Sequence, residues 1–209
     1  MAKYTGPRCK ICRREGVQLM LKGQRCLTEK CGLKRKKNVP GKLAKRKGKL
    51  SEYGMQLREK QKIRKTYGVL EKQFYTSFEE AARMTGLTGE NMLSLLERRL
   101  DNALYRMGFA ASRSQARQFI QHGHVLVNAK KVDVSSYILR ENDMVEISEQ
   151  FKENAALLEA VKLSKAVSAK PEWLDVDYEK KNAKVSRLPR RQDVVMNFNE
   201  QLVVELYSK

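Results

Sequence analysis

The chain has 209 residues, 41% of them hydrophobic, and its 43 Lys and Arg against 24 Asp and Glu give a net charge of +19. This length predicts one or two domains with a modest core, and this charge requires a polyanionic partner, either nucleic acid or an anionic membrane. No run of 18 apolar residues occurs, and residues 1–10 lack the apolar segment of a secretory signal, so we expect no membrane partner and a cytoplasmic protein with reduced thiols.

The positive charge is concentrated in residues 1–50, which contain 17 Lys and Arg but only Glu15 and Glu29 as acids, a net charge of +15. The other 159 residues carry a net charge of only +4. Within the arm, residues 34–50 mix basic side chains with Gly and Pro and show no periodic apolar face, which predicts an extended segment that orders against a partner. A solvated tail is the alternative, but so dense a charge repels itself unless it is neutralised.

All the cysteines of the chain lie in this arm, as two close pairs separated by an insert of hairpin length. They are Cys9, Cys12, Cys26 and Cys31. This spacing predicts a closed tetrahedral zinc site with Zn–S bonds of ~2.3 Å. A [4Fe–4S] cluster fits the same ligands and is less favoured, and free thiols are a third interpretation. Disulfides are disfavoured because the cytosol keeps thiols reduced. No His or Asp replaces a cysteine, so we expect a structural metal that fixes the neighbouring basic side chains in one geometry.

Three helices are predicted after the arm, over residues 51–67, 71–85 and 89–107, because apolar residues recur there at helical spacing. Ser51 is expected to cap the first helix, and glycines follow each of the three. The side chains expected to point inward from the first two helices are Tyr53, Leu57, Ile63, Phe74, Phe78, Ala81 and Ala82.

A compact helix and strand unit follows. Ser112 and Gln115 match a capping box that opens a helix over 113–122, and Gly123 is placed to end it. Its predicted inward residues are Ala116, Phe119 and Ile120. Further along the chain we expect a helix over 152–166 and strands over 125–127, 131–134, 144–147, 173–176, 183–188 and 202–207.

Arginines are expected along the polar edges of two of these helices. Arg99 and Arg106 are seven residues apart in the predicted helix 89–107, and Arg113 and Arg117 share a face of the next helix. The free N–H groups at the start of that next helix would suit a phosphate. From periodicity alone, an ordinary solvated helix face explains these arginines equally well.

Particular motifs carry a resemblance to known proteins. Residues 99–110, 112–120 and 122–128 resemble the small RNA-binding domain shared by ribosomal proteins, pseudouridine synthases and tyrosyl-tRNA synthetases. The whole chain resembles the bacterial small-subunit ribosomal protein four family, through the four cysteines and the segments 4–9, 57–61, 67–68 and 199–208.

The resemblance implies a non-enzymatic primary binder of small-subunit ribosomal RNA, which docks at a multi-helix junction early in subunit assembly. It also implies a position near the path of incoming messenger RNA, beside ribosomal protein five, with an effect on translational accuracy and, in some members, repression of the protein's own messenger. The resemblance carries RNA contacts onto Arg99, Ser112, Arg113, Ser114, Arg117 and Gln121. The basic arm and the first helix add the candidates Lys3, Tyr4, Arg8, Lys10, Arg13, Arg14, Arg25, Lys34, Arg35, Lys36, Lys37, Lys45, Arg46, Lys47, Arg58, Lys62 and Arg64.

The expected fold class is α+β, with a mainly helical body, an embedded small RNA-binding domain of helices and strands, and an N-terminal zinc-binding arm. The arm covers residues 1–50, the small domain 99–151, and a supporting domain 51–98 together with 152–209.

Two rival functions follow from the same features. An RNA-modifying enzyme could carry this small domain, but the chain has no glycine-rich nucleotide loop, and His122 and His124 have no obvious nucleophile nearby. A zinc-bearing DNA regulator would need a recognition helix for the major groove, and the basic arm lacks one.

Overall fold

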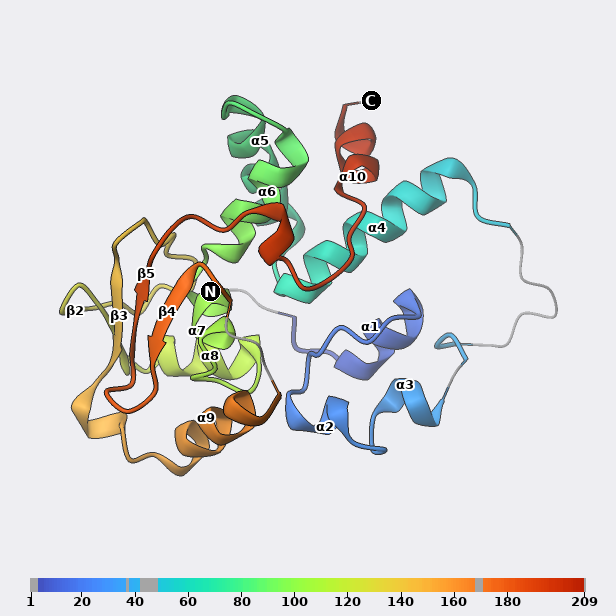
Figure 1. Cartoon of the computed structure of the whole chain (residues 1–209). Helices are drawn as coiled ribbons and strands as arrows, with labels where there is room; N and C mark the ends of the chain where they lie inside the picture. The colour runs from blue at the N-terminus through green and yellow to red at the C-terminus, as the bar shows by residue number, and fades with distance from the viewer. Residues whose placement is uncertain (1–3, 37, 42–48, 168–170, 209) are drawn as a thin grey trace. The chain divides into compact units, whose positions relative to one another are not determined.

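A computed structural model describes residues 4–36, 38–41, 49–167 and 171–208 of the chain (Figure 1). The chain forms two compact units, Met1–Met92 with Met196–Lys209, and Leu93–Val195. The class is α+β, mostly helical with one small antiparallel sheet, as predicted. Among the described residues, none of the helices combines the length and apolar character that crossing a membrane requires.

The first unit is built from helices. Three short ones, drawn in blue in Figure 1, form the cysteine-containing arm, and longer ones follow. They are α1 (Arg8–Glu15), α2 (Gln24–Leu27), α3 (Gly32–Arg35), α4 (Glu52–Tyr67), α5 (Glu71–Arg83), the start of α6 (Thr88–Glu97), and α10 (Glu200–Tyr207).

Helix α4 begins and ends where the sequence predicts. The Ser51 hydroxyl accepts a hydrogen bond from the Gly54 N–H at 3.1 Å, and Gly68 ends the helix with φ 66°. The predicted inward position of Tyr53 is wrong, because 60% of this residue is exposed. The buried face begins later and includes Ile63 and Tyr67. In α5, Phe74 and Ala81 are buried as predicted, whereas Ala82 is exposed.

The strand predicted over 202–207 is wrong, because this segment forms helix α10, which packs against α4. Its Val and Tyr residues favour strands, but tertiary packing overrides that preference. Val203 is fully buried, and the ring of Tyr207 lies 4.8 Å from that of Phe78. The Tyr207 hydroxyl donates to Glu71 at 3.0 Å, which places the end of α10 on α5 as well.

The second unit contains an antiparallel five-stranded sheet in the order β2-β1-β3-β5-β4, with helices α7 (Leu100–Arg106), α8 (Arg113–Gln121) and α9 (Ala155–Val167). The short 3₁₀ turns Glu149–Phe151 and Arg191–Asp193 complete it. The strands are β1 (Val125–Val127), β2 (Lys130–Lys131), β3 (Met144–Ile147), β4 (Leu174–Asp177) and β5 (Asn182–Val185). Strands β1 and β3 match the prediction, whereas β2 and β5 stop short of it.

The segment 152–195 was expected to support the helices 51–98, but α9, β4 and β5 lie in the second unit. Only residues 196–209 return to the first unit. Strand β5 is paired along β3, with Val145 opposite Ala183, so the sheet is continuous across the expected boundary.

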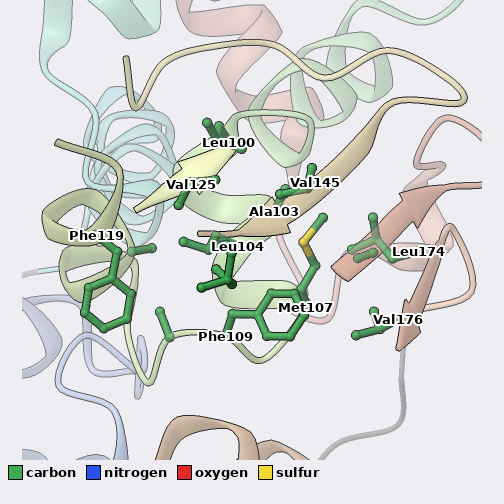
Figure 2. Packing of buried hydrophobic residues seen from close by; sticks show 14 of the residues in the cluster. Leu100, Ala103, Leu104, Met107, Phe109, Phe119, Val125, Val145, Leu174 and Val176 are labelled. Carbon is green, nitrogen blue, oxygen red and sulfur yellow. The ribbon is translucent and has the colours of Figure 1, made fainter. Parts of the chain in front are cut away.

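The core of this second unit lies between the sheet and its helices (Figure 2). Leu104 of α7 and Met107, which directly follows this helix, lie in one cluster with Val145 of β3, Val176 of β4 and Phe119 of α8. Alternate strand residues point inward, so β1 and β4 each bury two apolar side chains. Burying each large side chain stabilises the unit by about 1.5–3 kcal/mol. This core fixes α7 and α8 against one another and against the sheet.

The predicted N-cap of α8, Ser112, is confirmed, whereas Gln115 bonds the residue before Ser112 and does not complete the capping box. The Ser112 hydroxyl accepts from the Gln115 N–H at 3.4 Å, and the Gln115 amide oxygen accepts from the Ala111 N–H at 2.7 Å. Gly123 follows the helix with φ 74°, a conformation that suits glycine. Ala116, Phe119 and Ile120 are buried as expected.

The helix predicted over 89–107 is interrupted, so that prediction is wrong as a single element. Arg99 leaves the helical conformation with ψ 135°, which separates α6 from α7. The segment 135–139 satisfies the backbone at this break, because Leu100 donates to Tyr137 O at 2.8 Å and Leu139 donates to Arg98 O at 2.9 Å. Arg99 therefore does not share a helix edge with Arg106.

Candidate functional site

The four cysteines line one pocket in the arm. Cys9 and Cys12 lie on α1, Cys26 lies on α2, and Cys31 directly precedes α3. Three of them are at most 7% exposed, Cys9 is half-buried, and none forms a disulfide. The four cysteine side chains therefore lie close together, as predicted. Yet no group of three or more His, Cys, Asp and Glu, within the part of the chain that the structure describes, is arranged as a ready metal site.

The groups around these sulfurs shift the pKa of the thiols in both directions. Burial raises the pKa of the Cys12 and Cys26 thiols, and the neighbouring cysteines raise it further. Backbone N–H donors act in the opposite direction, from Leu19 toward Cys12 and from Lys22 to Cys26 Sγ at 3.3 Å. Such donors favour thiolates, the form that binds metal. The donor set thus suits a soft divalent metal, which would offset the repulsion among the thiolates.

Basic side chains surround this pocket. Arg8 and Arg13 are half-buried and bond to backbone carbonyls, of Leu21 at 3.3 Å and of Asn38 at 2.9 Å. The exposed candidates are Tyr4, Lys10, Arg14, Arg25, Lys34, Arg35 and Lys36. Five other predicted contacts lie outside the described residues, namely Lys3, Lys37, Lys45, Arg46 and Lys47.

The arm is joined to α4. Glu15 of α1 pairs with Arg58 of α4 at 3.2 Å, and the Lys65 ammonium lies 4.7 Å from the centre of the Tyr4 ring. The other α4 candidates are half-buried and paired, Lys62 with Glu59 at 2.6 Å and Arg64 with Glu71 at 3.3 Å. The arm therefore has a defined position on this helix.

In the second unit, two arginines that were predicted to contact RNA both bind the carboxylate of Asp101. Arg99 donates to both oxygens of Asp101, at 3.2 and 3.0 Å, and Arg117 Nε donates to Asp101 Oδ2 at 2.6 Å. Asp101 is fully buried and Arg99 is 5% exposed. The sequence had placed these arginines on outward edges; for Arg99 this is wrong, and the Arg117 side chain is only 13% exposed.

Arg113 is held in a comparable way by the next residue along α7. Its Nε donates to Asn102 Oδ1 at 2.8 Å, and its guanidinium lies 4.6 Å from the centre of the Tyr105 ring. Ser112 and Ser114 are half-buried at the start of α8, and Gln121 is exposed at its end. The structure thus brings four of the predicted RNA contacts together in the N-cap and first part of α8, namely Ser112, Arg113, Ser114 and Arg117. Gln121 is not among them.

Asp101 and Asn102 were not among the predicted site residues. A signal was present, because both are polar residues next to Leu100, Ala103 and Leu104 on the buried side of a helix. Buried polar groups need partners. The sequence alone did not show that the partners would be the arginines of α8.

Comparison with known proteins agrees with this arrangement. The family described as "Ribosomal protein S4/S9 N-terminal domain" matches residues 3–97, and the "S4 domain" matches residues 98–145. "Small ribosomal subunit protein uS4" of Thermodesulfovibrio yellowstonii is 52% identical over the whole of both chains. The proteins of the same name from Geobacter sulfurreducens and Halothermothrix orenii are 50% and 48% identical, again over the full length of both chains.

The S4 domain, preceded by the matched N-terminal domain in a chain whose full length aligns with small ribosomal subunit proteins, defines a ribosomal protein with an RNA-binding domain. The similarity over the full length makes the assignment more specific. The chain belongs to the uS4 family of small ribosomal subunit proteins.

Proposed function

We propose that this protein is a structural component of the small ribosomal subunit that binds its ribosomal RNA at a junction of several helices. One observation carries the proposal: the segment that holds net charge +15 contains the cysteine pocket and is joined to α4 through Glu15 and Arg58. The basic residues of this segment that the structure describes thus have a defined place beside α4, as the recognition of a particular phosphate arrangement requires.

The expected mode of recognition is by shape. The major groove of an RNA helix is deep and narrow, so side chains read backbone geometry more readily than base edges. Where helices meet, phosphates from several strands lie close together. Arginine suits paired phosphate oxygens through its planar fork, and lysine acts as a point charge. Basic groups on the arm and on α8 could therefore contact different RNA strands of one junction.

We propose further that the four cysteines hold one structural zinc ion. Four thiols that line one pocket, three of them buried, together with N–H donors to two of the sulfurs, support this assignment. A zinc ion would supply folding free energy on the order of 10 kcal/mol to an arm too short to bury a core. Its effect on RNA binding would be indirect, through the ordering of the basic residues around the pocket. An iron–sulfur cluster remains the alternative occupant.

The finer functions implied by the resemblance stay predictions. These are a position near incoming messenger RNA, contact with ribosomal protein five, an influence on accuracy, and repression of the protein's own messenger.

Binding measurements test the proposal directly. The purified chain should bind a small-subunit junction RNA at least tenfold more tightly than duplex DNA or a random RNA of equal length, with about ten phosphates neutralised and a slope of log affinity against log salt of about −7 to −9. Equal affinity for all three would overturn junction recognition. Sedimentation with the small subunit in a sucrose gradient, with about one zinc per chain, would support both proposals.

A further inference from the structure

Beyond the RNA contacts themselves, we propose that Asp101 is a positioning residue, which fixes the guanidinium group of Arg117 in the orientation that RNA requires. This inference rests on the proposed RNA-binding function. Asp101 would not touch the RNA. It would act through Arg117, and Asn102 would act in the same way through Arg113.

The geometry carries this inference. Asp101 and Asn102 are consecutive residues in the first turn of α7, and Arg113 and Arg117 are one turn apart on α8. Each α7 side chain accepts the Nε–H of one arginine, at 2.6 Å for the Asp101–Arg117 pair and 2.8 Å for Asn102–Arg113. A bond to Nε fixes the plane of a guanidinium group, because Nε lies in that plane. The two planes are therefore set by neighbouring residues of a buried helix turn.

The supporting residue is itself rigid. Asp101 is fully buried, and its backbone N–H donates to Ser135 O at 3.1 Å. Arg99 binds both of its carboxylate oxygens, so the carboxylate has a preferred orientation before Arg117 is considered. Packing of Leu100, Ala103 and Leu104 into the core holds this turn in place (Figure 2). A fixed carboxylate is what a directional contact with Arg117 requires.

Energetics favour a positioning role over a purely stabilising one. Removing a carboxylate from water is costly, and an apolar side chain of similar size is often at least as stabilising as a buried ion pair. What a buried carboxylate adds is a fixed orientation of the guanidinium group that it binds. Bidentate recognition of phosphate by arginine depends on the orientation of the guanidinium plane, whereas a lysine at the same place would supply charge without a plane.

A double-mutant cycle tests the inference in the full-length chain. Asp101→Asn and Arg117→Gln should each weaken binding to the junction RNA by about tenfold, and the double variant should be no more than about twofold weaker than Arg117→Gln alone. If Asp101→Asn weakens binding by the same factor in both backgrounds, Asp101 does not act through Arg117 and the inference is overturned.

Two further variants separate positioning from folding. Asp193→Asn removes another buried carboxylate of the same unit, which pairs with Arg187 at 2.6 Å, and should leave RNA affinity unchanged. Arg117→Lys keeps the charge and leaves the buried Asp101 a cationic neighbour, so it tests the inference even if Asp101→Asn does not fold. We expect Arg117→Lys to lose nearly as much affinity as Arg117→Gln, and full affinity would overturn the inference.

Failure of the inference differs from failure of the proposed function. If wild-type protein binds the junction RNA and Arg117→Gln binds equally well, Arg117 is not a contact and the inference is wrong, while RNA binding stands. If wild-type protein does not discriminate the junction from random RNA, the proposed function itself is wrong.

Discussion

The carboxylate of Glu15 lies 3.2 Å from the guanidinium of Arg58, and the Glu15 side chain is only 5% exposed. Burial raises the pKa of Glu15, while Arg58, Lys62 and Arg14 lower it, and the net effect is a raised pKa. The contact joins two segments that the sequence shows as separate, the basic arm and the first long helix. It is therefore one of the contacts that place the described part of the basic arm beside α4.

An asymmetry between the two partners is expected. Arg58→Gln leaves a buried carboxylate with weaker compensation and should lower the free energy of unfolding by about 1–2 kcal/mol. Glu15→Gln removes the buried charge and should cost less than about 1 kcal/mol. Urea unfolding of both variants, followed by circular dichroism of the helices, measures the difference. A larger cost for Glu15→Gln than for Arg58→Gln would contradict this account.

Removing charge from α8 should weaken binding evenly across RNA sequences. The double variant Arg113→Gln with Arg117→Gln should reduce the magnitude of the salt slope by about two, since each arginine is expected to neutralise one phosphate. Filter binding at several salt concentrations, on a set of junction RNAs of varied sequence, measures both effects. A loss confined to one RNA sequence would show base readout in place of shape recognition.

Chelation should affect the two units differently. A zinc chelator, or replacement of the four cysteines by serine, should lower affinity for junction RNA by about tenfold because the basic arm loses its fixed geometry. Trp173, the one tryptophan of the chain, is fully buried in the second unit, so its fluorescence should not change. Readdition of zinc to the chelated protein is the control. A parallel loss of the Trp173 signal would mean that the metal supports the whole fold.

Acid should reveal the contribution of Asp193. Burial raises the pKa of this carboxyl, but hydrogen bonds from Arg187 and the Arg190 N–H outweigh burial, so its pKa lies below the ordinary 3.8. A depressed folded-state pKa means stabilisation that is present above the unfolded value and is lost as pH falls through the folded one. Asp193→Asn should cost about 1–3 kcal/mol at pH 7, with the difference from wild type shrinking below pH 3.8. Urea unfolding followed by Trp173 fluorescence tests this, and a difference independent of pH would contradict it.

The last helix should contribute measurably to the first unit. Tyr207→Phe removes the hydrogen bond to Glu71 and should cost about 1 kcal/mol, while Tyr207→Ala also removes the ring packed on Phe78 and should cost about 2–4 kcal/mol. Thermal unfolding of the full chain provides the comparison. Exposed Tyr53→Ala is a matched control, since 60% of that residue is in solvent and its loss should change stability by less than about 0.5 kcal/mol.

Features with local causes were predictable from the sequence. The hydroxyl of Ser51 caps α4, Gly123 follows α8, and the spacing of the cysteines brings their side chains to one pocket. Features that depend on distant partners were not. The break at Arg99 depends on residues 135–139, and α10 is a helix because it packs on α4 despite its strand-forming residues.

The same limit applies to the site. Spacing along α8 correctly indicated that Arg113 and Arg117 share a face, but it did not show that Asp101, sixteen residues before Arg117, holds that side chain. Contacts between groups on different elements depend on how those elements pack. No periodic pattern in the sequence indicates which residues on different elements will pair. The sequence does show Asp101 and Asn102 as polar residues among apolar ones that point inward.

The way that late segments complete both units has a consequence for synthesis of the chain on the ribosome. Strand β5, at Asn182–Val185, pairs with β3, and α10, at Glu200–Tyr207, packs on α4. A nascent polypeptide that ends before these segments therefore lacks α10 on α4 and one of the two strands that flank β3. Neither unit can complete its packing before these two segments have been synthesised, so a shorter nascent chain lacks part of the structure that holds its basic residues in place.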